Sequence, residues 1–148
     1  TASQTNLLIA EAITKGWVSG NAKDYFDAGV KAHMDQVSEM DANSVVSTSA
    51  ADAYLAANPF SATTALEQIN TQYWISSFLN GPEAFANFRR SGFPKLTANP
   101  FPGKAIKGDF INRLTYPNSE ISVNSVNVKG AIANQGADDL DTKVWWHK

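Results

Sequence analysis

The sequence predicts an all-α protein, mostly helical with long irregular loops. Three observations support this prediction. Apolar residues recur at three- and four-residue spacing along residues 22–40, which is the period of an amphipathic helix. A second long helical pattern covers residues 62–79 and stops at Gly81-Pro82. The 148 residues are 43% hydrophobic and 11% aromatic, which suffices for a core and excludes general disorder.

Composition narrows the classes of function. A net charge of −2 gives no electrostatic reason to expect a nucleic-acid partner. The chain has no cysteine, which excludes disulfides, thiolate metal sites and cysteine nucleophiles. No apolar run approaches the roughly 20 residues of a membrane span. A length of 148 residues predicts a single domain over residues 1–148. The chain begins with Thr1 in place of an initiator methionine and enters a helical pattern at once, so we expect it to be a fragment of a longer protein.

Residues 1–40 predict a helical hairpin. Good helix formers run from Leu7 to a stop at Gly16, and Asn21 is a suitable N-cap for residues 22–40. Small residues such as Gly29 would let the two helices approach closely. The hairpin is similar to one tetratricopeptide unit, and no second copy follows at that period.

Residues 61–92 predict the central helices. A short helix capped by Ser49 precedes them and ends near residue 57, and Ser61 is the expected cap of residues 62–79. Pro82 suits the first turn of the next helix, and Gly92 suits its end. Arg89 and Arg90 fall in the last turn of that helix, where cations are favoured.

Residues 93–148 predict a loop-rich C-terminal part. Prolines at 94, 100 and 102 and a lack of periodicity indicate a long loop to residue 108, of a kind that often carries function. A short helix is expected near 126–134. Asp138, Asp139 and Asp141 are interpreted as a solvated acidic turn, since they lack the spacing of a calcium loop.

Four strings, in order, resemble motifs of the SusD/RagB family of outer-membrane proteins. The first is AEAITKGWVSGNAKDYFDAGVKAHM, and the second is INTQYWISSFLNGPEAFANFRRSGFP, which is similar to the family's Gln-x-Trp helix, Glu-Ala-(Trp/Phe) helix and Arg-Arg-(Thr/Ser)-Gly-(Tyr/Phe)-Pro turn. RLTYPNSE and the terminal VWWHK resemble its later segments. The chain departs from the pattern at Phe85, Ser91 and His147, where Trp, Thr and Asp are frequent.

The resemblance implies the C-terminal portion of a SusD-like nutrient-binding lipoprotein. Such proteins are held by an N-terminal lipid anchor on the extracellular face of the outer membrane, bind oligosaccharides without enzymatic activity or cofactor, and deliver them to a SusC-type TonB-dependent transporter. Two alternatives stay open. One is a peptide-binding SusD/RagB-type protein, and the other is a tetratricopeptide-type protein-interaction module.

Aromatic residues near the loops are the candidate ligand-binding residues, because aromatic rings stack on the apolar faces of sugars. One of two adjacent tryptophans is expected to seal the core while the other is exposed. The candidates are Trp145, Trp146, Phe101 and Phe110.

A second group of residues is interpreted as a structural corner, with Trp74 in the core in preference to a sugar-stacking role. An Arg–carboxylate pair is favoured over an anion site, with Glu83 or Glu120 as acceptors. Glu67 and Glu83 each have a simple helical explanation, so a glycosidase pair is disfavoured, and His33 and His147 lack metal-ligand spacing. The predicted corner comprises Trp74, Phe85, Arg89, Arg90, Arg113, Tyr116 and Glu120.

Overall fold

The computed structural model describes residues 1–147, and over these residues it contains seven α-helices, one 3-10 helix and no strand. The all-α prediction is therefore confirmed. The chain divides into two compact units, Thr1–Pro94 and a second unit that begins at Lys95. The predicted single-domain organisation stays a prediction, since two units can belong to one domain of a longer protein.

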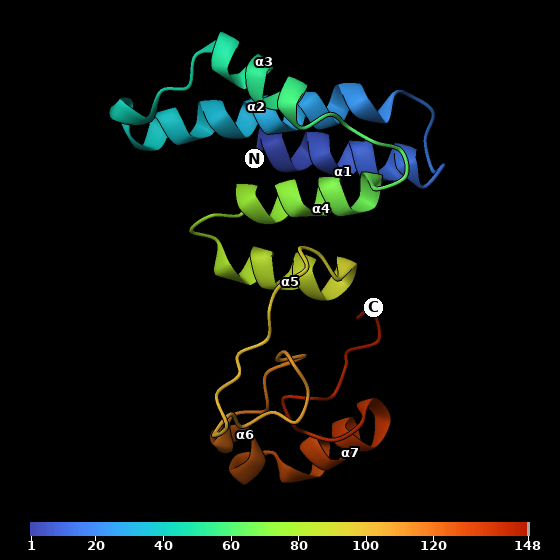
Figure 1. Ribbon diagram of the computed structural model, residues 1–148. Coiled ribbons are helices and arrows are strands. Elements are labelled where there is room, and N and C mark those ends of the chain that lie inside the picture. The colour runs from blue at the N-terminus through green and yellow to red at the C-terminus, as the bar shows by residue number, and fades with distance from the viewer. Residues whose placement is uncertain (148) are drawn as a thin grey trace. The chain divides into compact units, whose positions relative to one another are not determined.

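The first unit is a stack of helices. α1 (Ala2–Thr14) packs between α2 (Ala22–Met40) and α4 (Ala65–Ser76), and α5 (Gly81–Ser91) packs against α4 (Figure 1). The 3-10 helix η1 (Ala42–Ser44) and α3 (Thr48–Ala57) follow α2 in the chain and contact it. The predicted hairpin is thus α1 with α2.

The core lies where α1, α2 and α4 meet. Its buried side chains come from one face of each helix, as the helical period requires. Gly29 on α2 permits the contact with α1, because a Cβ at this position would lie 2.7 Å from Leu7 Cγ and 3.2 Å from the Ser3 carbonyl oxygen. The buried apolar cluster comprises Leu7, Ala10, Phe26, Val30, Ala65, Ile69 and Tyr73.

Local side-chain chemistry sets the helix ends. Asn21 accepts a hydrogen bond from the amide of Lys23 and caps α2 as predicted, and Gly92 ends α5 in the left-handed region at φ 76°. The cap of α3 is Ser47, two residues before the predicted Ser49, because the Ser47 side chain accepts from the amide of Ala50.

The predicted helix over residues 62–79 is too long at both ends. Ser61 does not cap it, because its hydroxyl pairs with that of Thr63 and its amide donates to Gln68, so α4 starts at Ala65. α4 ends at Ser76, because the next residues leave the α-helical pattern. The Phe78 amide donates to the carbonyl of Ile75, three residues earlier, and Leu79 adopts φ 65°.

The second unit contains α6 (Asn118–Val123) and α7 (Ser125–Gln135), joined to long irregular segments. The proline-containing stretch through residue 108 has no helix or strand, as predicted. α7 covers the predicted residues 126–134, and Gly136 follows its end.

Candidate functional site

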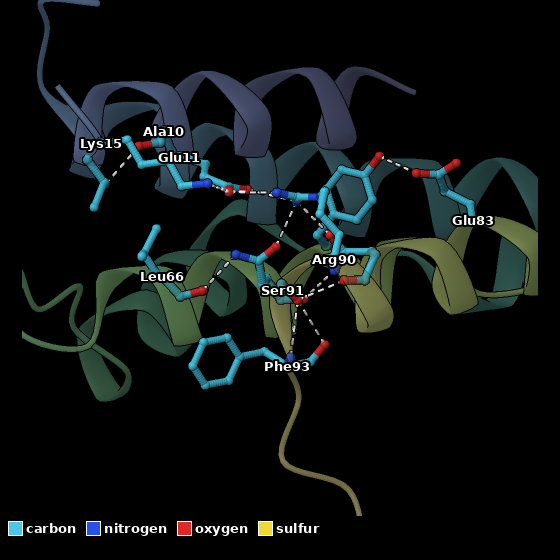
Figure 2. Close-up of polar contacts among 12 residues, drawn as sticks. Ala10, Glu11, Lys15, Leu66, Glu83, Arg90, Ser91 and Phe93 are labelled. Atoms are coloured by element: carbon cyan, nitrogen blue, oxygen red, sulfur yellow. Dashed lines mark hydrogen bonds and ion pairs between the residues drawn. The ribbon is translucent and has the colours of Figure 1, made fainter. Parts of the chain in front are cut away.

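Arg90, in the last turn of α5, joins three helices through one guanidinium group (Figure 2). Its two terminal nitrogens donate to the two carboxylate oxygens of Glu11 on α1, at 2.7 and 2.8 Å. The second nitrogen also donates to the side-chain oxygens of Asn70, at 3.0 Å, and Asn87, at 2.8 Å. The planar fork of arginine suits this bidentate arrangement.

The Glu11 carboxylate is charged and already occupied. Burial by itself raises the pKa of Glu11, but the hydrogen bonds from Arg90 and from Lys15, whose Nζ lies 2.7 Å from Oε1, outweigh burial and lower it. The hydrogen bonds from Arg90 to Glu11 outweigh burial and raise the pKa of Arg90. Since Glu11 is 4% exposed, this cluster holds the helices together and offers no open carboxylate to a ligand.

Glu83 does not accept from arginine, contrary to the prediction. Its Oε1 accepts a hydrogen bond of 2.7 Å from the hydroxyl of Tyr73 (Figure 2). Burial and this bond raise the pKa of Tyr73 to about 12. The Arg90 acceptor is Glu11, far away in the chain and therefore out of reach of local sequence reasoning.

Arg113 forms a separate corner within the second unit. Its guanidinium lies 3.2 Å from Asp138 Oδ1 and 5.3 Å from the centre of the Tyr116 ring, and Asp138 also accepts from the Tyr116 amide. Glu120, the other predicted acceptor, is exposed and accepts from Asn124. The predicted corner thus consists of two clusters, one in each unit.

The remaining corner residues have separate environments. The Arg89 guanidinium lies 3.9 Å from the centre of the Phe85 ring, and both side chains are partly buried. Trp74 is 38% exposed, so its predicted place in the core is wrong. It lines a groove beside the turn between α4 and α5, because the inward face of α4 is taken by Ile69 and Tyr73.

The acidic residues near the C-terminus lie in a bend, as predicted, and Asp139 is exposed there, but Asp138 and Asp141 also bond to other parts of the second unit. The Asp141 carboxylate accepts from the amides of Lys107, at 2.9 and 3.0 Å, and Gly108, at 2.8 Å. These backbone hydrogen bonds lower the pKa of Asp141. Asp139 accepts from Thr142. Asp141 therefore fixes the end of the proline-containing loop. Among residues 1–147, no group of three His, Cys, Asp or Glu side chains is placed to hold a metal ion.

The predicted ligand-binding aromatics differ in exposure. Trp145 is 95% exposed and Phe101 is 59% exposed, whereas Trp146 and Phe110 are partly buried. Sequence reasoning missed one further aromatic residue, Trp17, which is 72% exposed in the turn between α1 and α2 with Lys15 Nζ 4.7 Å from its ring centre. Its position between two glycines, in a predicted turn, was the signal.

Comparison with known proteins assigns the chain to one family. The family described as "SusD-like: Susd and RagB outer membrane lipoprotein" matches residues 1–147. No curated protein matches the chain. No helix within the described residues is long and apolar enough to cross a membrane.

Solved structures agree with this family match. The chain is 39% identical to a chitin-binding protein, with a TM-score of 0.91, over 98% of this chain and 32% of that one. It is 34% identical to a Bacteroidetes SusD-like protein, with a TM-score of 0.88, over 99% of this chain and 29% of that one. A SusD homologue from Bacteroides fragilis is 28% identical, with a TM-score of 0.84, over 97% of this chain and 34% of that one. The chain therefore spans about a third of each of these proteins.

Proposed function

The chain belongs to the SusD-like family of outer-membrane lipoproteins, and from this we propose that it is the C-terminal portion of a glycan-binding protein. The proposed protein captures oligosaccharides at the extracellular face of the outer membrane and delivers them to a SusC-type TonB-dependent transporter. The 39% identity to a chitin-binding protein carries the choice of a glycan over a peptide.

We infer that the exposed aromatics of the second unit contact the sugar. Trp145 and Phe101 present large apolar side chains to solvent, at 95% and 59% exposure. An apolar ring face in water is a favourable partner for the apolar face of a pyranose ring. The hydrogen bonds from Lys107 and Gly108 to Asp141 restrain the loop that carries Phe101, which lowers the entropic cost of binding.

The proposed function involves no catalysis. Three carboxylates of the first unit are buried or partly buried: Glu11 is bonded to Arg90, Asp27 to Lys23 and Glu83 to Tyr73. Each therefore has a structural partner where a hydrolase would need a free acid and a free base.

The ligand class can be tested by affinity gel electrophoresis of the chain against glycol chitin, other soluble polysaccharides and a peptide mixture. We expect retardation by glycol chitin and none by peptides. Retardation by peptides alone would favour the peptide-binding alternative. Co-purification of the native protein from outer membranes tests the partner. A TonB-dependent barrel should accompany it, and the association of soluble helical proteins instead would favour the interaction-module alternative.

A further inference from the structure

An apolar groove lies beside the turn between α4 and α5, wholly within the first unit. Its volume is about 510 Å³. Its lining residues are His33, Trp74, Ile75, Ser77, Phe78, Leu79, Gly81 and Ala84, and none of them is charged at neutral pH, because burial lowers the pKa of His33. We refer to this surface as the α4–α5 groove.

The groove exposes large side chains that water does not favour. Phe78 is 66% exposed and Leu79 is 81% exposed, while Trp74 and Ile75 are each 38% exposed. Leu79 also adopts φ 65°, a left-handed conformation that is unfavourable for a residue with a branched side chain. The backbone is therefore held in an unfavourable conformation with an aliphatic side chain directed outward. Contiguous exposed apolar side chains of this kind mark interaction surfaces.

The chemistry of the groove fits protein better than sugar. The hydroxyl of Ser77 is already used, since it donates to the Tyr73 carbonyl and accepts from Gln4. Among the lining side chains, His33 has a buried Nδ1 without a hydrogen-bond partner. A glycan needs several directional hydrogen bonds, whereas aliphatic and aromatic side chains without charge suit the apolar face of a helix.

The lengths of the matched proteins show that most of each of their chains has no counterpart in these 148 residues. Almost the whole chain matches its relatives, yet it covers 32%, 29% and 34% of their chains. We propose that the α4–α5 groove is an internal interface of a longer SusD-like chain, filled by an apolar helix face from the segment preceding Thr1. This inference rests on family membership and on the chain being a C-terminal portion. It does not depend on which ligand the protein binds.

Hydroxyl-radical footprinting of the 148-residue chain and of the longer gene product tests the proposal. Oxidation of Phe78 and Leu79 is expected to be at least about tenfold lower in the longer chain, because a buried side chain is shielded from the radical. Val45, which is 68% exposed and lies outside the groove, should be oxidised equally in both chains. Unchanged oxidation of Phe78 and Leu79 would overturn the proposal. So would a gene in which no segment precedes Thr1.

A pair of variants separates an interface from a general effect of added charge. Phe78→Asp should leave the melting temperature of the 148-residue chain unchanged but lower that of the longer chain by at least about 4 °C, because only there is the aspartate buried. Val45→Asp is the control of matched exposure and should change neither. Equal effects of the two variants on the longer chain would contradict the proposal. The proposal would also be overturned if Phe78 and Leu79 were oxidised equally in the two chains and were protected instead by glycol chitin or by dimerisation of the 148-residue chain.

Discussion

Replacing Arg90 by methionine should destabilise the first unit strongly. Methionine keeps most of the apolar stem but loses all four hydrogen bonds to Glu11, Asn70 and Asn87. Glu11, whose side chain is 5% exposed, would keep Lys15 as its charged neighbour. Removing one partner of a buried pair costs about 3–5 kcal/mol, and we expect the lower end because the Arg90 side chain is 36% exposed.

The assay is chemical and thermal unfolding of the 148-residue chain, followed by circular dichroism. A loss of about 3 kcal/mol corresponds to a melting temperature lower by about 6–12 °C for a protein of this size. The matched control is Arg89→Met, which removes a cation–π contact with Phe85 and should cost about 1 kcal/mol. The reasoning is refuted if Arg90→Met costs no more than Arg89→Met. A double variant Glu11→Met/Arg90→Met should recover much of the loss, since the buried carboxylate that has lost its arginine is then removed as well.

Three further predictions concern packing, titration and loop order. Gly29→Ala should lower the free energy of unfolding by about 1 kcal/mol or more in chemical denaturation, because the new methyl group has no space against α1. Gly130→Ala is the control in α7, where the space around the glycine is open, and it should raise the free energy of unfolding by about 0.5–1 kcal/mol. The free energy of unfolding should fall as pH rises from 10 towards 12, because the unfolded state loses the Tyr73 proton at about 10 and the folded state only at about 12. Tyr73→Phe should remove this fall from the curve of stability against pH. Asp141→Ala should speed amide hydrogen exchange at Lys107 about tenfold, as measured by NMR.

Sequence reasoning recovered those parts of the fold that local chemistry decides. The bounds of α2 follow from the Asn21 cap and the apolar period, and the end of α5 follows from Gly92. The start of α4 was missed because the Ser61 hydroxyl pairs with that of Thr63 and does not accept from an amide of the helix. Whether a polar side chain caps a helix depends on competing partners, and the sequence does not rank these partners.

The polar clusters were harder to predict because their partners are distant in sequence. Arg90 and Glu11 are 79 positions apart, and Arg113 and Asp138 are 25 apart. The sequence predicted that the arginines need fixed carboxylates, and the structure supplied which ones. Trp74 was misplaced because a broad apolar stripe on α4 does not reveal which part of it the neighbouring helices cover.

The most direct test of the proposed glycan capture is calorimetric titration of chitohexaose into the chain and into its Trp145→Ala variant. Because Trp145 is 95% exposed, the substitution should leave the melting temperature unchanged. We predict that it weakens binding roughly tenfold through the loss of one stacking contact. Equal affinities of the two proteins, or no binding by either, would contradict the assignment of glycan capture to the exposed aromatics of this chain.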